Sequence, residues 1–528
     1  MGIPSYFSYI VKNHRNILKK YNNSFKINNI YLDCNSIIYD CVHSIEYKNN
    51  NVEFERKLLK EVCNKINSYI ETIKPDKKVL IAFDGVAPVA KLEQQRNRRY
   101  KSWFQKEIIE EIYNDRKKSW DTTAITPGTN FMSNLVSNVE KYFEETSKFN
   151  VDEIIIYASD VPGEGEHKIF DYIRKNENYH KNTSTAIYGL DADLIMLTLN
   201  HLHITNNLYL FRETPHFIKN VDSTLNPDEN YVLDIPEFSN VLESVMVKNK
   251  KSKSINKKNL ILDYVLMCFF LGNDFLPHFP ALNIRTNGID YMMEAYSETL
   301  GTTNEYLTDD DNVVWKNLRK IISWLSEKEK TYILHEYKMR KKYEKKFYPI
   351  ETPEQEEYKF MMIPTYERNV EKYINPNEDG WEERYYKQLF DVDITEERKK
   401  QICINYLEGL EWTINYYTTG CIDWRWKYNY NYPPLLTDLI KYTPYFDTKL
   451  IQENDNKPVS DLVQLSYVLP RNSLKLLPVS IKNKLLKDFS ENYSLNFKFE
   501  WCFCKYFWES HVIMPEIDIN NLESIVTS

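Results

Sequence analysis

Glycine is scarce in this sequence. Only 12 of the 528 residues are glycine, well below the ~7% that is usual in globular proteins. Half of them lie within or beside acidic clusters or at an expected helix start: Gly85, Gly128, Gly163, Gly165, Gly189 and Gly272. In a chain that otherwise avoids glycine, we expect these positions to be tight loops that need its backbone freedom.

Other absences narrow the class of protein. The 8 cysteines show no CxxC spacing, so no disulfide framework is indicated and we expect buried thiols in a reducing compartment. No apolar run reaches the ~18 residues of a membrane span, and the first residues lack a signal-peptide pattern, so we expect no membrane association. The formal net charge is −8, and any contact with nucleic acid would therefore need a local basic patch.

The sequence does contain short apolar runs that end in acidic residues. Residues 154–157 and 186–188 are typical of strands, and a helical pattern lies between them. In an open α/β sheet, ligands bind beyond the carboxyl ends of the parallel strands. We therefore expect the acidic residues that follow these two runs to meet at one sheet edge: Asp160, Glu164, Glu166, Asp191 and Asp193.

Three further aspartates follow the same pattern. Asp33 and Asp84 each end an apolar run, and Asp274 follows a longer apolar segment that could be a buried strand or a helix. Any one of them could be an ordinary turn or cap residue. A whole set of carboxylates at the ends of buried segments is not explained in that way, because surface charges normally lie on solvated faces. Carboxylates ~4 Å apart repel by about 1–4 kcal/mol, so such a set needs cations. Hard oxygen ligands favour Mg²⁺ or Mn²⁺.

A basic stretch follows Asp84 closely. On a helix, Lys91, Gln95, Arg98 and Arg99 share one face. A cationic face with an amide donor, one turn from a metal site, is suited to binding a phosphate. The alternative is a solvated helix face with internal pairs from Glu93; beside the acidic loops we favour the phosphate site.

The length predicts more than one folding unit. We expect an α/β core over 1–300, a charged connection over 301–380, and an aromatic-rich, largely helical segment over 381–528 that closes the site. The lysine run at 248–258 is expected to be a solvated loop, with a nuclear-localisation signal as the less favoured interpretation. We expect a cytoplasmic monomer.

Several long motifs resemble one family. SDVPGEGEHKIFDYIR, YGLDADLIML, FDGVAPVAKLEQQRNRR, FLGNDFLPH and the initial MGIPSYF are similar to the XRN 5′-to-3′ exoribonucleases. The resemblance continues through WEERYYKQLFDVD and GLEWTINYYTTGCIDWRW. It implies a mixed, mostly parallel central sheet flanked by helices, as in flap-endonuclease or PIN-like nucleases, with a two-metal site and without long C-terminal extensions.

The resemblance also implies roles for single residues. The metal ligands would be Asp33, Asp84, Glu164, Glu166, Asp191, Asp193 and Asp274, and the 5′-phosphate pocket would be Lys91, Gln95, Arg98 and Arg99. The family stacks the terminal base between a histidine and a tryptophan. Here Tyr39 stands in place of the histidine, either Trp424 or Trp426 is the tryptophan, and Pro88 packs beside the stack. Tyrosine can still stack on a base.

The expected function is therefore processive 5′-to-3′ hydrolysis of single-stranded, 5′-monophosphorylated RNA with two Mg²⁺ or Mn²⁺ ions. The alternatives are a flap-type DNA nuclease, which shares the acids but not the KLEQQRNRR and WRW stretches, and a catalytically idle protein that binds RNA 5′ ends. A zinc hydrolase built on His167 and His278 is disfavoured, because each histidine stands alone in its cluster.

Overall fold

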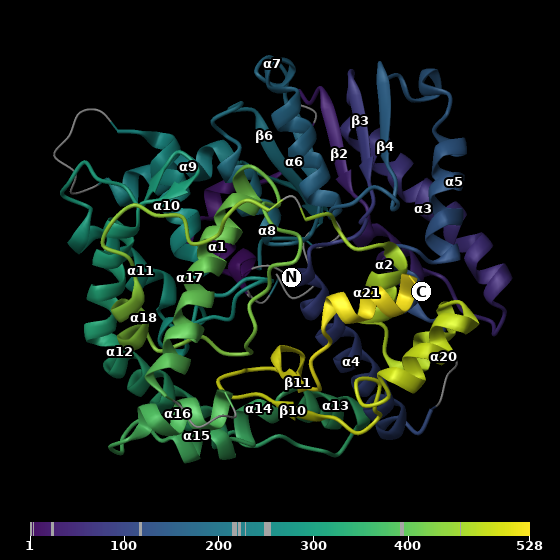
Figure 1. Ribbon diagram of the computed structural model, residues 1–528. Coiled ribbons are helices and arrows are strands. Elements are labelled where there is room, and N and C mark those ends of the chain that lie inside the picture. The colour runs from purple at the N-terminus through teal and green to yellow at the C-terminus, as the bar shows by residue number, and fades with distance from the viewer. Residues whose placement is uncertain are drawn as a thin grey trace.

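The computed structural model describes residues 3, 5–22, 26–115, 119–213, 219, 223–226, 229–247, 255–390, 395–454 and 456–527. Its centre is a seven-stranded sheet in the order β1-β7-β6-β5-β2-β3-β4 (Figure 1). The strands are β1 (Leu18–Lys20), β2 (Asn29–Asp33), β3 (Lys78–Ala82), β4 (Glu153–Tyr157), β5 (Thr185–Tyr188), β6 (Leu208–Glu213) and β7 (Asn230–Leu233). The predicted mixed, mostly parallel sheet is confirmed.

From β2 onward, the chain adds strands first toward one edge of the sheet and then toward the other. β2 pairs in parallel with β3 on one side and with β5 on the other. β3 continues in parallel to β4, and β5 continues in parallel to β6. The chain therefore winds outward from β2 to β4 and then starts again at β5. The carboxyl ends of β2 and β5 form the switch point where ligands bind in such sheets.

Helices cover both faces of the sheet, and the rest of the chain is mostly helical. Two small ribbons, β8 (Thr308–Asp309) with β9 (Asn312–Val313) and β10 (Lys498–Glu500) with β11 (His511–Ile513), lie outside the main sheet. The helices are α1 (Tyr6–Asn13), α2 (Asn35–Ser44), α3 (Asn51–Ile73), α4 (Val89–Ile112), α5 (Asn130–Tyr142), α6 (Gly165–Lys175), α7 (Glu177–His180), α8 (Asp193–Asn200), α9 (Ile235–Met246), α10 (Lys257–Phe269), α11 (Gly288–Thr299), α12 (Trp315–Glu344), α13 (Pro353–Met361), α14 (Ile363–Tyr366), α15 (Asn369–Ile374), α16 (Trp381–Phe390), α17 (Glu396–Thr418), α18 (Leu436–Tyr442), α19 (Asp461–Val468), α20 (Val479–Asp488) and α21 (Ile519–Thr527).

Successive residues of β2 pack in different apolar clusters on the two faces of the sheet. Ile30 and Leu32 of β2 pack with α3 and α5 on one face of the sheet. Tyr31, between them, packs with α6, α8 and α10 on the other face. This is the two-residue period of a strand that is buried on both sides. A third apolar cluster joins the start of α4 to the C-terminal segment 459–522. α4 therefore links the sheet to the rest of the chain, and it runs away from the sheet in Figure 1.

The chain between β6 and the lysine run contains a strand and a helix that were not predicted from sequence. β7 pairs with β6 there, and α9 follows it with the Asp234 side chain accepting a hydrogen bond from the Glu237 backbone N–H. The segment 257–269, which sequence left open between strand and helix, is helix α10. Residues 248–254 of the lysine run lie outside the described residues, so its localisation role stays a prediction.

The divisions at 301 and 381 also stay predictions. α12 crosses most of the middle range, and its apolar side, including Leu318, Ile321 and Leu325, is buried in the same core as one face of the sheet. In the described part of the chain, no helix combines the length and apolar character that a membrane crossing requires.

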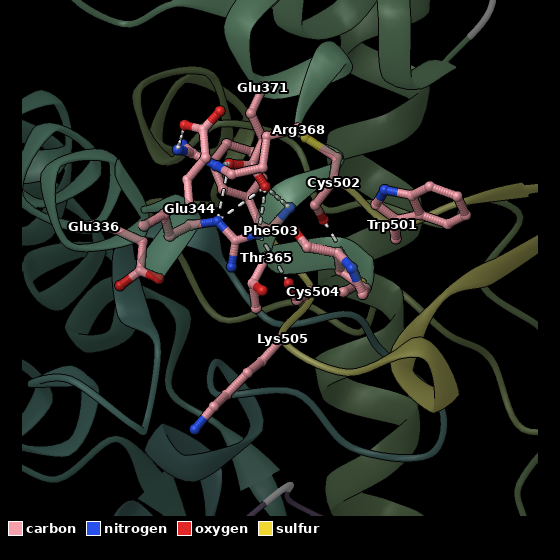
Figure 2. A network of polar contacts seen from close by, with 12 residues as sticks. Glu336, Glu344, Thr365, Arg368, Glu371, Trp501, Cys502, Phe503, Cys504 and Lys505 are labelled. Atoms are coloured by element: carbon pink, nitrogen blue, oxygen red, sulfur yellow. Dashed lines mark hydrogen bonds and ion pairs between the residues drawn. The ribbon is translucent and has the colours of Figure 1, made fainter. Parts of the chain in front are cut away.

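A buried ion-pair network joins three distant segments (Figure 2). The Glu371 carboxylate on α15 accepts hydrogen bonds from the Arg340 and Arg368 side chains, and from the Phe503 backbone N–H at 2.9 Å. The Arg340 guanidinium also donates to the Cys504 carbonyl at 2.8 Å. The side chains of Arg340, Arg368 and Glu371 are at most 4% exposed. The network ties α12 and α15 to the C-terminal segment that leads into β11.

Candidate active site

The predicted acidic residues come together where the central strands end. Asp33 is the last residue of β2, Asp84 follows β3, and Asp191 follows β5. Glu164 and Glu166 lie at the N-terminus of α6, Asp193 is the first residue of α8, and Asp274 follows α10. Asp33, Glu164, Glu166, Asp193 and Asp274 are buried, whereas Asp191 is exposed. Asp160, which lies earlier in the first acidic loop, is exposed as well and does not line the cavity described below.

Gly165 lets α6 approach the strand ends. Its backbone N–H donates to Asp84 Oδ1 at 2.7 Å. A Cβ atom at this position would lie 2.6 Å from Asp33 Oδ1 and 3.2 Å from the Ala82 carbonyl oxygen, so any side chain would displace a site carboxylate. The positive N-terminal end of the α6 dipole therefore lies beside the acidic residues. Tight loops were expected at the scarce glycines; Gly165 instead begins a helix, and what requires glycine there is the close approach to Asp33 and Ala82.

Asn35 fixes the orientation of Asp84, and the sequence reasoning missed it. Its Nδ2 donates to Asp84 Oδ2 at 2.5 Å, and its Oδ1 accepts from the Asp84 backbone N–H at 3.2 Å. Asn35 follows Asp33 by two residues at the start of α2. An amide directly after a strand-terminal aspartate was the available signal.

Lys91 lies inside the acidic cluster. Its Nζ is 2.6 Å from Glu164 Oε1 and 2.5 Å from Asp274 Oδ2. Burial lowers the pKa of Lys91, but the carboxylates of Asp274 and Glu164 raise it by a larger amount. The net shift is therefore upward. Burial likewise raises the pKa of Asp274 while Lys91 lowers it, and the net shift is downward. This pair is charged, and it connects α4 to the loop after α10.

The rest of the predicted basic face lines one cavity with the acids. Gln95, Arg98 and Arg99 border a cavity of about 180 Å³, together with Tyr39. The same cavity is lined by the acidic residues Asp33, Asp84, Glu164, Glu166 and Asp191. Arg96 points elsewhere, because its guanidinium donates to the Asn492 and Pro515 carbonyls. Gln95, Arg98 and Arg99 of α4 thus line the cavity, whereas Arg96 of the same helix binds the C-terminal segment.

The carboxylates carry more negative charge than the described residues neutralise. Burial, followed by the nearby Asp84 and Asp191, raises the pKa of Asp33 well above its usual range. Burial and Glu164 raise the pKa of Glu166, and burial and Asp274 raise that of Asp193 to about 7. Asp33 Oδ1 and Asp193 Oδ1 are buried and have no hydrogen-bond partner among the described residues. An all-carboxylate donor set with open oxygens fits a hard divalent cation.

A column of aromatic rings supports one side of the acids. Tyr416 of α17 donates from its hydroxyl to Glu164 Oε2 at 3.1 Å. Its ring stacks on His167, with centroids 3.7 Å apart, and on Trp412, at 4.8 Å. Trp426 stacks on the far side of Trp412 at 5.1 Å. Sequence reasoning missed Tyr416, although it stands in the NYY run of the aromatic segment.

The two candidate stacking tryptophans differ in their packing. The Trp426 ring lies against Trp412, and a Cβ on Gly409 would approach it to 2.9 Å, so it packs between protein groups. The Trp424 carbonyl accepts from the Val89 backbone N–H at 3.0 Å, which places this residue next to Pro88, the buried residue that precedes α4. Neither tryptophan nor Pro88 lines the 180 Å³ cavity, whereas Tyr39 does.

The two histidines of the disfavoured zinc interpretation lie at different sites. His167 lies near Glu164 and Glu166, with which it could hold a metal ion. Burial and Lys91 lower its pKa well below the usual range, so the imidazole is neutral. His278 lines a different cavity with Arg285 and Glu509. The described residues therefore offer one histidine, and not two, to a metal at the acidic cluster.

Comparison with known proteins covers nearly the whole chain. Residues 1–214 match the family model described as XRN 5'-3' exonuclease N-terminus. Residues 254–375 and 364–528 match the model described as Xrn1 helical domain. The residues between the two matches, 215–253, include β7 and α9.

Curated relatives are similar at low identity. The chain is 26% identical to 5'-3' exoribonuclease 2 of Gallus gallus, over 89% of this chain and 62% of that protein. It is 26% identical to the 5'-3' exoribonuclease 2 homolog of Drosophila melanogaster, over 89% and 62%. With 5'-3' exoribonuclease 1 of Saccharomyces cerevisiae it shares 27% identity over 91% of this chain and 40% of that protein. The chain thus spans less than two thirds of the length of these relatives. On the two family models, it belongs to the XRN family of 5'-3' exonucleases.

Proposed function

We propose that this chain is a processive 5′-to-3′ exoribonuclease that degrades 5′-monophosphorylated, single-stranded RNA to mononucleotides. One observation carries the proposal: a single cavity of about 180 Å³ is lined both by carboxylates and by Gln95, Arg98 and Arg99. The relatives support RNA as the substrate, because they are named 5'-3' exoribonucleases.

The two sides of the cavity define a direction. Arginine pairs with phosphate oxygens through several N–H groups, so Arg98 and Arg99 would hold the 5′ phosphate. The scissile phosphate on the 3′ side of the same nucleotide would then lie at the carboxylates. Because the cavity is small, it would take one nucleotide of a single strand. Each cleavage would release one mononucleotide, and the shortened RNA would advance by one position.

The carboxylates would hold two Mg²⁺ or Mn²⁺ ions, with Asp33, Asp84, Glu164, Glu166, Asp191, Asp193 and Asp274 as the candidate ligands. When bound, such ions promote ionisation of the attacking water and stabilise the leaving oxygen. The chain's own groups keep the ligands in place. Asn35 and the Gly165 N–H orient Asp84, Tyr416 orients Glu164, and Lys91 holds Asp274 against the cluster.

The test of the proposal is the preference for the 5′ end. A hydrogen bond to a charged group contributes about 1.5–3 kcal/mol, and ~1.4 kcal/mol corresponds to a factor of ten. Arg98→Ala should therefore lower kcat/KM on 5′-monophosphate RNA by roughly one to two decades. The loss on 5′-hydroxyl RNA should be much smaller, because that end lacks the contact. Both enzymes are to be assayed on both substrates.

Arg56→Ala is the matched control, since Arg56 is exposed on α3 outside the cavity. It should leave both rates unchanged. An equal fractional loss on the two RNAs with Arg98→Ala would assign Arg98 to general backbone attraction and place the 5′-end selectivity elsewhere. A wild-type protein that degrades none of these RNAs in Mg²⁺ or Mn²⁺ would overturn the proposed activity.

The two tryptophans should respond differently to substitution. We infer that Trp424 stacks on the RNA, because it lies beside Pro88 while the Trp426 ring packs on Trp412. A base–aromatic stack contributes about 1–3 kcal/mol. Trp424→Ala should therefore raise KM for RNA by roughly tenfold with little change in the melting temperature. Trp426→Ala should instead lower the melting temperature, by truncating a ring packed between protein groups. The reverse pattern would exchange the two roles.

A further inference from the structure

A groove of about 860 Å³ adjoins the site cavity. The two share Tyr39 of α2 and Arg98 and Arg99 of α4 among their lining residues. None of the candidate metal ligands lines the groove. The arginines and Tyr39 therefore stand between the groove on one side and the carboxylates on the other.

The lining of the groove combines cations with aromatic rings. Lys106 and Trp103 follow Arg98 and Arg99 on α4, and Lys475 lies on the facing segment, a short 3-10 helix at Arg471–Leu476. Trp103 is half-buried, and its ring is tilted relative to that of Phe497, with centroids 5.6 Å apart. Trp120, also in the lining, is nearly covered by Phe54 and Phe131. Of the two tryptophans in the lining, Trp103 is thus the one with ring surface open to a planar ligand.

The charge of the groove is moderate. Glu107, Glu110 and Asp121 also line it. Asp121 is 3.3 Å from Lys475 Nζ, and Glu110 is 3.7 Å from Lys106 Nζ. The two lysines are therefore paired within the groove, and a single phosphate would lie near Arg98 and Arg99.

The position of the groove restricts what it can hold. This step rests on the proposed function. If the 5′ phosphate lies at Arg98 and Arg99 and the scissile phosphate at the carboxylates, the incoming RNA extends away on the carboxylate side. The groove then lies beyond the 5′ end. Only a group attached to that end, or the nucleotide released from it, can reach the groove.

We propose that the groove binds the nucleoside 5′-monophosphate product and is its route of release. Its volume of about 860 Å³ falls in the range of ~300–1,000 Å³ that is usual for small-molecule sites. The product carries a base for Trp103 and a phosphate that Arg98 and Arg99 already contact. Release through the groove leaves the RNA in place on the opposite side, which permits processive advance.

The proposal predicts a particular form of product inhibition. AMP in the cavity competes with RNA, but AMP in the groove blocks release while RNA is bound. Inhibition by AMP should therefore include a component that saturating RNA does not remove. Trp103→Ala and Lys106→Glu should each weaken that component by roughly tenfold, as expected for the loss of one base stack or of one cation of the lining. The initial single-turnover cleavage of 5′-monophosphate RNA should be unchanged.

The test uses the full chain with Mg²⁺, AMP as the probe, and Lys330→Glu as the matched control, since Lys330 is exposed on α12 and outside the groove. Lys106 is also exposed, so its variant tests the groove even if Trp103→Ala folds poorly. Purely competitive inhibition, or unchanged inhibition in Lys106→Glu, would overturn the groove assignment while RNA decay continues. If the wild type degrades 5′-triphosphate RNA and Lys106→Glu does not, the product-release assignment would be overturned. The groove would then bind groups attached to the RNA 5′ end. Absence of RNA decay in the wild type would overturn the proposed function instead, and direct titration with AMP would still decide whether Lys106→Glu weakens binding.

Discussion

Asp191→Ala combined with Asp193→Ala should abolish hydrolysis of RNA while binding of 5′-monophosphate RNA persists. Both residues lie at the acidic cluster, after β5 and at the start of α8, whereas the proposed phosphate contacts come from α4. Bound metal ions contribute several kcal/mol of transition-state stabilisation, so the rate should fall by roughly a thousandfold or more at ~1.4 kcal/mol per decade. Decay assays and equilibrium binding of a short RNA measure the two properties separately.

The metal-free protein provides an independent control for this prediction. The clustered carboxylates raise one another's pKa values, as Asp84 and Asp191 do for Asp33. Asp193→Asn keeps the side-chain shape and removes one charge from the cluster. It should therefore raise the melting temperature in EDTA and reduce the further increase that Mg²⁺ gives to the wild type. If Asp193→Asn melts earlier in EDTA and gains as much from Mg²⁺ as the wild type, the carboxylate is not a metal ligand.

The strands and the acidic edge could be predicted from sequence because their signals are local. Apolar runs of four or five residues followed by a turn define strands, and β2 to β6 follow this pattern. α3 has helical periodicity, with Leu58, Val62 and Ile66 buried along it, and Thr129 caps α5 by accepting from the Met132 backbone N–H. β7 is a four-residue strand in a polar stretch, and it was missed. The Asp234 cap and Glu237 three residues later were the signal that could have located α9.

The contacts that decide the site connect residues far apart in the sequence. Helical spacing placed Lys91 on a face with Gln95 and Arg98, but not beside Asp274, 183 residues away. Likewise, no local pattern distinguishes Trp424 from Trp426, because only the packing of Trp426 on Trp412 does so. The groove beyond Arg99 is also built from several segments, including α2, α4 and residues 470–475. Such arrangements depend on tertiary packing, which periodicity does not report.

Glu371→Gln should be among the most destabilising substitutions in the chain. Glu371 is the shared acceptor of two buried arginines, Arg340 and Arg368, and Figure 2 shows it beside Arg368 in this network. Removing one partner of a buried pair costs about 3–5 kcal/mol, because the remaining charge is left uncompensated. Glutamine has the same shape, so the loss reports the charge and not a cavity. A shift in the midpoint of urea unfolding measures it.

The local consequence of this substitution is the sharper test. The Glu371 carboxylate also accepts from the Phe503 N–H, and Arg340 donates to the Cys504 carbonyl, so the network holds the segment that leads into β11. In Glu371→Gln, hydrogen exchange should accelerate over 498–513 before it does so in the central sheet. Glu356→Gln, at an exposed position on α13, should change the unfolding free energy by less than about 0.5 kcal/mol. A loss below about 1 kcal/mol in Glu371→Gln, with exchange over 498–513 unchanged, would mean that apolar packing and not this network anchors the C-terminal segment.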